Sequence, residues 1–141
     1  MMHMTMRWFG PEQDSITLQQ IRQVPGMEGI ITALHELPAG EPWPEDMVRE
    51  RKALVEKNGL KLLGIESINV HEDIKYGAST RDMYIENYIK SLEAVGKNDI
   101  HLVCYNFMPV FDWTRTDLAL PLEDGSTALA YDGKEIEGLS A

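Results

Sequence analysis

Five side chains with chemistry suited to hydroxylated acids stand at or near the ends of short apolar runs. Trp8 could form the floor beneath a sugar-like ligand, and the amide of Asn106 could bind either neighbouring backbone or a ligand hydroxyl. His71 could act as an acid, a base or a ligand, and Glu66 directly follows an apolar run. The guanidinium of Arg115 matches the shape of a carboxylate. This pattern predicts a polyol or acid site but provides no complete catalytic set.

Several of these residues also have an ordinary structural interpretation. Trp8 could plug the mouth of a barrel, as large aromatic side chains often do. His71 lies in a polar stretch and could be exposed to solvent. Arg115 could form an ion pair with Asp112 or Asp117, which flank it in the sequence. The sequence by itself leaves these alternatives open.

The sequence offers little for a metal site. Cys104 is the only cysteine, which excludes an intrachain disulfide and a cysteine cluster, and its apolar surroundings predict a buried side chain. His101 and Cys104 would point to opposite faces of a strand and could not bind one ion. Glu72 and Asp73 are expected to be solvated. The P-loop, dinucleotide-binding, zincin and serine-hydrolase motifs are also absent from the sequence.

The elements that must position these residues alternate between strands and helices. Apolar runs bounded by turn residues predict strands over residues 4–9, 29–34, 60–65 and 100–105. Apolar spacing of three and four residues predicts a short helix through Leu18 and Arg22 and a second helix over residues 44–57. A third helix is predicted to start at a capping box of Ser79 and Asp82 and to end before Gly96. The stretch around His71 is predicted to be a polar loop, residues 121–131 to contain a turn, and the tail after residue 132 to be frayed.

This order predicts an α/β fold with right-handed crossovers and a parallel sheet. An open doubly wound sheet and part of a (β/α)8 barrel both fit. A complete barrel usually needs about 250 residues, so 141 residues with four strands would form about half of one. In both architectures the site lies at the carboxyl ends of the strands, here residues 8–10, 34–36, 66–73 and 106–115.

Length and composition indicate one domain or part of one. Apolar residues make up 43% of the chain and charged residues 26%, as in globular proteins. The net charge of −10 disfavours nucleic acid and anionic membranes as partners. Because no apolar run is long enough to span a membrane and the first residues lack the regions of a signal peptide, we expect a cytoplasmic protein.

Residues 103–118, with the sequence VCYNFMPVFDWTRTDL, closely resemble the D-mannonate dehydratase family. Further matching segments cover almost the whole chain: MRWFG (6–10), IRQVPGM (21–27), IES (65–67), VHEDIK (70–75), TRD (80–82), YIENYI (84–89) and GSTALAY (125–131). Phe9 stands where the family is expected to have tyrosine.

The resemblance implies a xylose-isomerase-like TIM barrel that removes water from D-mannonate to give 2-dehydro-3-deoxy-D-gluconate in hexuronate catabolism. It also implies a divalent metal, Mn²⁺ or Fe²⁺, which would offset the charge of an enediolate-like intermediate. The His, Cys and Asp ligands of that metal would belong to a second half that this chain lacks, and Cys104 would not replace the missing cysteine. The full enzyme is expected to be a homo-oligomer acting on a small sugar acid.

We therefore expect residues 1–141 to be the N-terminal part of a single TIM-barrel domain, inactive by itself. His71 is its candidate catalytic residue, and the candidate substrate-binding residues are Trp8, Glu66, Asn106 and Arg115. Two alternatives remain: a non-enzymatic half-barrel that pairs its open edge with another chain, and another sugar-acid isomerase or lyase on the same barrel.

Overall fold

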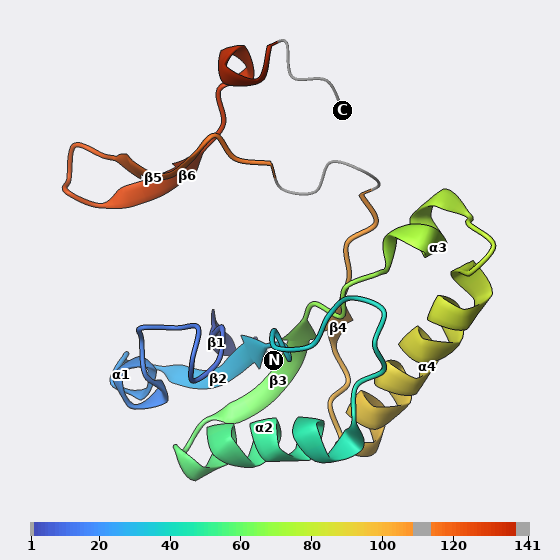
Figure 1. The fold of residues 1–141 in the computed structure, drawn as a ribbon. Helices are drawn as coiled ribbons and strands as arrows, with labels where there is room; N and C mark the ends of the chain where they lie inside the picture. Colours follow the sequence, from blue (N-terminus) through green and yellow to red (C-terminus); the bar gives the residue numbers. More distant parts are fainter. Residues whose placement is uncertain (1, 109–113, 138–141) are drawn as a thin grey trace. The chain divides into compact units, whose positions relative to one another are not determined.

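The computed structural model describes residues 2–108 and 114–137 of the chain. The chain divides into two compact units, Met1–Phe107 and Met108–Ala141. The described part of the first unit holds a parallel sheet and the helices that connect its strands, and that of the second holds a hairpin and a short 3-10 helix (Figure 1). The strand-end residues Asp112 and Trp113 lie outside the described residues.

The four-stranded sheet confirms the predicted parallel α/β arrangement. Its strands are β1 (Met4–Arg7), β2 (Met27–Thr32), β3 (Lys61–Glu66) and β4 (Val103–Cys104). Each strand pairs in parallel with the next one in the chain, in the order β1-β2-β3-β4. Each new strand is therefore added on the same side of the previous one, and the carboxyl ends of all four strands point to the same end of the sheet.

The fourth strand is shorter than predicted, because the residues before it turn the chain out of the preceding helix. The Ile100 N–H donates to the Val95 carbonyl at 3.3 Å, and Asp99 adopts a left-handed conformation with φ 58°. These residues complete the helix end instead of joining the sheet. Only residues 103–104 remain to pair with β3.

Three helices confirm the predicted positions: α1 (Leu18–Arg22), α2 (Glu45–Lys57) and α4 (Arg81–Lys97). The predicted capping box of Ser79 and Asp82 is wrong, because α4 starts one residue later, with Thr80 as its N-cap and no side-chain cap bond. The polar loop predicted around His71 is also wrong in part, since it contains the helix α3 (Glu72–Tyr76). A five-residue helix is too short for its apolar spacing to be visible in the sequence.

The second unit pairs β5 (Asp117–Pro121) antiparallel with β6 (Thr127–Ala130). Between them the Asp124 carboxylate accepts hydrogen bonds from the backbone N–H and the hydroxyl of Ser126 at 3.0 and 2.6 Å, which holds the turn. The 3-10 helix η1 (Gly133–Ile136) follows, so the prediction of a frayed tail is wrong for residues 133–136. Residues 138–141 lie outside the described part.

The core of the first unit lies between one face of the sheet and the connecting helices. In Figure 1, α2 runs beside β3, and the end of α4 lies against the start of α2, in agreement with the contacts between these elements. Buried side chains come from both layers: Ile30, Thr32, Leu62 and Ile65 of the sheet, and Val48, Val55, Ala94 and Val95 of the helices. Burial of these side chains is the main stabilising contribution to the sheet.

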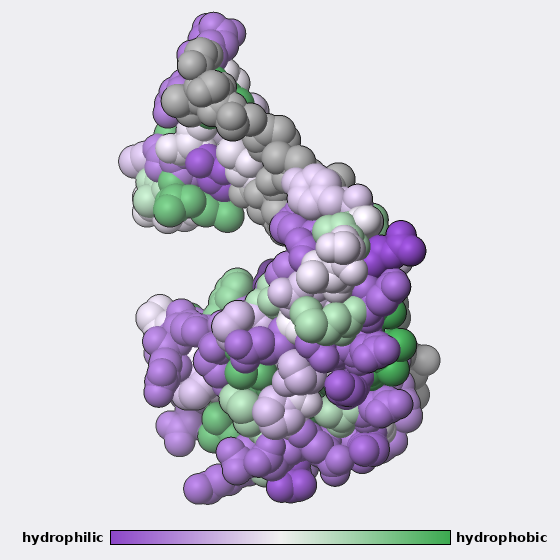
Figure 2. All heavy atoms as spheres, turned by 45° about the vertical axis from the view of Figure 1, so that its right-hand side comes forward, coloured by the Kyte–Doolittle hydropathy of each residue, from purple (hydrophilic) through white to green (hydrophobic). Residues whose placement is uncertain are grey.

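The opposite face of the sheet is more open. Cys104 is exposed, so the prediction of a buried cysteine is wrong. It lies on the edge strand in register with Glu66, whose side chain is also 42% exposed. Figure 2 shows a mostly hydrophilic surface of the first unit with hydrophobic side chains among the hydrophilic ones. On α4 the exposed apolar residues include Ile85, Ile89 and Leu92. Among the described residues, no helix has the length and apolar character of a membrane span.

Candidate functional site

The carboxyl ends of β1, β2 and β3 bring together four side chains, which we call the strand-end cluster: Arg7, Phe9, His35 and Glu66. The Arg7 Cζ lies 4.5 Å from the centroid of the Phe9 ring, and that ring lies 5.4 Å from the His35 ring. Arg7 Nη1 lies 3.5 Å from Glu66 Oε1. Arg7 is in register with Ile31, whose neighbours along β2 are buried in the core. The cluster therefore lies on the open face of the sheet.

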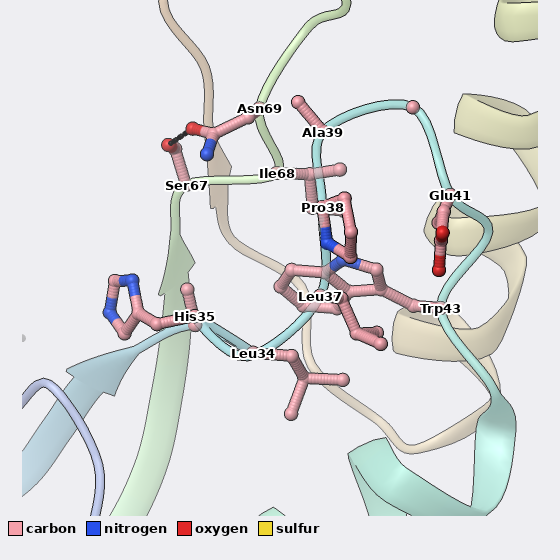
Figure 3. A pocket seen from close by; sticks show the side chains of 12 residues that line it. Leu34, His35, Leu37, Pro38, Ala39, Glu41, Trp43, Ser67, Ile68 and Asn69 are labelled. Atoms are coloured by element: carbon pink, nitrogen blue, oxygen red, sulfur yellow. Dashed lines mark hydrogen bonds between the residues drawn. The ribbon is translucent and has the colours of Figure 1, made fainter. Parts of the chain in front are cut away.

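The pKa of His35 is lowered, and one of its ring nitrogens makes no hydrogen bond with the described residues. Burial lowers the pKa of His35 below its ordinary value of 6.5, the charges of Arg7 and Arg51 lower it further, and Glu36 opposes them. The Nε2 atom is buried and makes no hydrogen bond with the described residues. Figure 3 shows the ring directed away from Trp43. Because buried polar atoms are nearly always hydrogen-bonded, this nitrogen marks a place where a ligand or a water molecule would bind.

Arg51 of α2 positions the loop that carries His35. Its Nη1 donates to the Ala33 carbonyl at 2.7 Å, and its Nη2 donates to Glu36 Oε1 at 2.8 Å. The Arg51 side chain is only 9% exposed. A Cβ atom at Gly10, where φ is +109°, would lie 3.2 Å from Arg51 Nη1, so the loop after β1 packs against the same guanidinium. Arg51 thus binds residues on both sides of His35 in the sequence, Ala33 and Glu36. It contacts the segments that follow β1 and β2.

A small pocket lies beside this loop (Figure 3). It is formed by residues of the segments 33–41 and 67–69 together with Trp43, and it has a volume of about 50 Å³. At its rim the Ser67 hydroxyl donates to Asn69 Oδ1 at 2.8 Å. A volume of this size holds a few water molecules at most, which is too little for a six-carbon acid. The pocket by itself is therefore not a substrate site.

Two of the residues predicted from the sequence lie at these strand ends. Glu66 belongs to the strand-end cluster, and its peptide bond to Ser67 is cis. Trp8 is buried, with 3% of its surface exposed, and its Nε1–H donates to the Ile16 carbonyl at 3.0 Å. Its indole therefore packs in the core and anchors the loop before α1. The proposed roles of both residues toward a substrate stay predictions.

His71 is fixed by a helix cap and by an aromatic stack. Its Nδ1 accepts a hydrogen bond from the Asp73 N–H at 3.1 Å, which caps α3, so in the neutral ring the proton is on Nε2. The ring stacks on Tyr84 with centroids 3.6 Å apart and 13° between the planes. A Cβ at Gly40 would come within 2.8 Å of both rings, so this close approach of the β2–α2 loop requires glycine. His71 is thus oriented as a hydrogen-bond donor through Nε2.

Asn106 and Arg115 fall in different units. Asn106 is half-buried, two residues after β4. Arg115 belongs to the second unit, where its Nη1 donates to the Thr114 carbonyl at 2.8 Å. The alternative ion pair of Arg115 with Asp112 falls on a residue outside the described part. Both site assignments stay predictions.

Sequence reasoning missed Arg7, Phe9 and His35 as members of one cluster. His35 directly follows the second predicted strand, which is a usable signal, but nothing in the sequence sets it apart from the other polar residues at strand ends. Arg7 lies inside a predicted strand, where a charged side chain marks the face that is not packed in the core. Their proximity depends on strand pairing between residues far apart in the sequence.

The described residues do not provide a metal centre. In residues 2–108 and 114–137, no group of three or more His, Cys, Asp or Glu side chains is close enough to hold an ion. The residues present therefore do not fit a divalent metal by themselves, and the expected Mn²⁺ or Fe²⁺ with its ligands elsewhere stays a prediction.

Comparison with known proteins gives consistent matches along the chain. A family model described as D-mannonate dehydratase (UxuA) matches residues 2–141. Mannonate dehydratase from Brachyspira hyodysenteriae is 60% identical over 131 residues, which cover 93% of this chain and 37% of that protein. Mannonate dehydratase from Thermotoga maritima is 54% identical over 139 residues, which cover 99% of this chain and 39% of that protein.

A solved structure agrees with these matches. The crystal structure of mannonate dehydratase from Streptococcus suis serotype 2 is 51% identical and aligns with a TM-score of 0.91, covering 99% of this chain and 40% of that one. This chain thus spans less than half the length of the proteins it matches. The resemblance in the sequence is confirmed, and the chain belongs to the D-mannonate dehydratase family.

Proposed function

We propose that this chain is part of a D-mannonate dehydratase, a hydro-lyase that removes water from D-mannonate to give 2-dehydro-3-deoxy-D-gluconate. The observation that carries the proposal is the likeness to the Streptococcus suis mannonate dehydratase over 99% of the chain, with a TM-score of 0.91 at 51% identity. Fold alone does not identify a reaction, but identity of this extent along the whole chain supports a common one.

The architecture that we propose is the first half of a (β/α)8 barrel of the xylose-isomerase-like class. The strand order β1-β2-β3-β4 supports it, because a barrel adds each strand beside the previous one, whereas a doubly wound sheet reverses direction at a switch point. The polar strand-end cluster supports it too. Arg7 and Glu66 lie on the face that would become the barrel interior, at the carboxyl ends where barrel enzymes carry their sites.

The residues of this chain would bind and orient the substrate. His71 would hydrogen-bond a substrate hydroxyl through Nε2–H, the tautomer that the α3 cap selects. Asn106 would bind a second hydroxyl, Glu66 would orient neighbouring donors, and Arg115 would be a further candidate for the carboxylate. Since the described residues hold no metal centre, we assign no step of the elimination to a metal here.

The family resemblance and the charge of the chain support a proposal for the setting of the enzyme. We expect a homo-oligomer in the cytoplasm that uses Mn²⁺ or Fe²⁺ and takes a small sugar acid as substrate. The net charge of −10 supports the absence of nucleic-acid and membrane partners.

The proposal is tested with a chimera in which residues 1–141 replace the matching segment of the Thermotoga maritima mannonate dehydratase. We expect the chimera to form the 2-keto product from D-mannonate with added Mn²⁺, and the 141-residue chain alone to give no more than a metal-only blank. The unmodified Thermotoga maritima enzyme is the control. A chimera that melts cooperatively but shows no turnover would refute the proposal.

A further inference from the structure

Arg7 is held more loosely than an arginine with a purely structural role. Its contacts with Glu66, from Nη1 to Oε1 and from Nη2 to the backbone carbonyl, are both 3.5 Å long, and its side chain is 42% exposed. Arg51 shows the structural alternative, with two hydrogen bonds below 3 Å and almost no exposure. A guanidinium has five N–H donors, and the Glu66 contacts engage two of them at most. Arg7 can therefore bind a second anion without breaking a short hydrogen bond.

The Phe9 ring fixes the direction in which Arg7 points. The guanidinium lies over the ring at 4.5 Å, an arrangement stabilised by the attraction between a cation and the π face. The same ring borders His35 at 5.4 Å. One half-exposed aromatic ring therefore contacts both a cation and an imidazole, and all three side chains lie at or just after strand ends.

The unpartnered Nε2 of His35 lies in this same cluster. A neutral imidazole both donates and accepts hydrogen bonds, one at each nitrogen, so it suits a hydroxyl group. The described protein residues leave Nε2 without such a partner. A carboxylate group with a hydroxyl on the next carbon would satisfy the arginine and the imidazole together.

We propose that Arg7, Phe9 and His35 form the subsite for the carboxylate end of a short hydroxy acid. Arg7 binds the carboxylate, Phe9 packs against the carbon chain, and His35 hydrogen-bonds the hydroxyl beside the carboxylate. The inference rests on the proposed function and assigns to its substrate a set of residues different from Arg115. Glu66 and Arg51 are positioning residues in this site, since they act on Arg7 and on the His35 loop.

The experiment uses Arg7→Gln and Arg7→Lys in the chimera. We expect Arg7→Gln to raise KM for D-mannonate about 10- to 100-fold, the value of a lost charge-assisted hydrogen bond. The KM of Arg7→Lys should lie between that of Arg7→Gln and that of the parent chimera, because lysine keeps the charge but cannot form the bidentate contact of a guanidinium with a carboxylate. Arg49→Gln removes an exposed guanidinium from α2 and is the matched control, with an unchanged KM.

The charge of the ligand gives a second measurement. D-mannonamide, in which an amide replaces the carboxylate, should compete weakly with D-mannonate in the parent chimera, and Arg7→Gln should remove most of this preference. His35→Phe should weaken binding of both compounds about 5- to 10-fold through the loss of a neutral hydrogen bond. His35→Gln, whose amide nitrogen reaches the Nε2 position, should restore most of that loss.

Two outcomes separate the inference from the proposed function. Arg7 variants that melt like the parent and keep both its KM and its preference for the acid would overturn the inference and leave the proposed function intact. A folded parent chimera without turnover would overturn the proposed function. In that case calorimetric binding of D-mannonate and D-mannonamide to the parent and to Arg7→Gln still decides whether the subsite exists.

Discussion

At the scale of single residues, His71 combines a structural contact with its proposed role toward substrate. Its Nδ1 caps α3, and its Nε2 carries the proton of the neutral ring. His71→Ala would remove both functions, whereas an asparagine at this position keeps a cap acceptor but is too short to reach the position of Nε2. A comparison of these two variants therefore separates stability from catalysis.

We expect His71→Ala in the chimera to lose about 1 kcal/mol of stability from the cap and about 10-fold in kcat/KM from the lost hydrogen bond of Nε2–H to the substrate. His71→Asn should keep the melting temperature and lose the same activity. Thermal melting and kcat/KM are measured on the same preparations. If His71→Asn melts and turns over like the parent, His71 has only its structural role.

His35 should make the folded state sensitive to acid. Because its pKa is lowered in the folded state, chiefly by burial and then by Arg7 and Arg51, the unfolded state binds the proton more readily. The contribution of His35 to stability is therefore complete above pH 6.5, the ordinary value, and decreases as the pH falls below it toward the lowered pKa.

The test is the melting temperature of the chimera and of its His35→Gln variant from pH 7.5 to pH 5. We expect the melting temperature of the parent chimera to fall, relative to that of His35→Gln, as the pH falls. His101→Gln is the control, since the His101 side chain is 81% exposed. A difference in melting temperature that stays constant over this range would show that the fold does not lower the pKa of His35.

At the scale of elements, the contact of α2 with the loop after β2 decides the geometry of the strand-end cluster. Arg51→Met keeps an unbranched apolar stem but removes the hydrogen bonds to Ala33 and Glu36. We expect a cost of about 2 kcal/mol in stability together with a higher KM for D-mannonate, because the His35 loop loses its anchor. Melting temperature and kinetics of the chimera are the measurements.

The matched control for this change is Arg49→Met, two residues earlier on the same helix and exposed. It should leave both quantities unchanged. An Arg51→Met variant with a lower melting temperature and an unaltered KM would mean that Arg51 supports α2 packing but not the position of His35.

At the scale of the whole molecule, the 141-residue chain exposes apolar surface that a compact monomer would bury. An apolar cavity of about 210 Å³ lies between α3, α4 and the segment after β4, lined by Val70, Ile74, Ile85, Tyr88, Ile89, Tyr105 and Phe107. β4 also forms one edge of the described sheet, and an edge strand presents backbone groups that another chain can pair with. Both features favour association between copies of the chain.

We therefore expect light scattering of the isolated chain to give a mass above the 16.0 kDa of one copy. Ile89→Glu, which places a charge in the apolar cavity, should lower this mass, and the exposed surface change Glu93→Gln should not. A monodisperse monomer with a sharp, cooperative melt would contradict the expectation.

The sequence by itself was sufficient for the family, for the parallel α/β class and for the positions of β1 to β3, α2 and α4. These elements are long or strongly apolar, so local periodicity determines them. The runs Ile30–Thr32 and Leu62–Ile65 and the stripe of Val48 and Val55 bury one face each, and such patterns are visible without any knowledge of partners.

Only the tertiary structure decided the end of α4, the helix α3, the exposure of Cys104 and the strand-end cluster. Each depends on a contact that periodicity does not encode: a cap by His71, a backbone bond from Ile100 to Val95, or strand pairing that brings Arg7 next to Glu66, 59 residues away. Sites at strand ends are assembled by such long-range pairing, because the sheet sets which carboxyl ends are neighbours and a residue type alone does not.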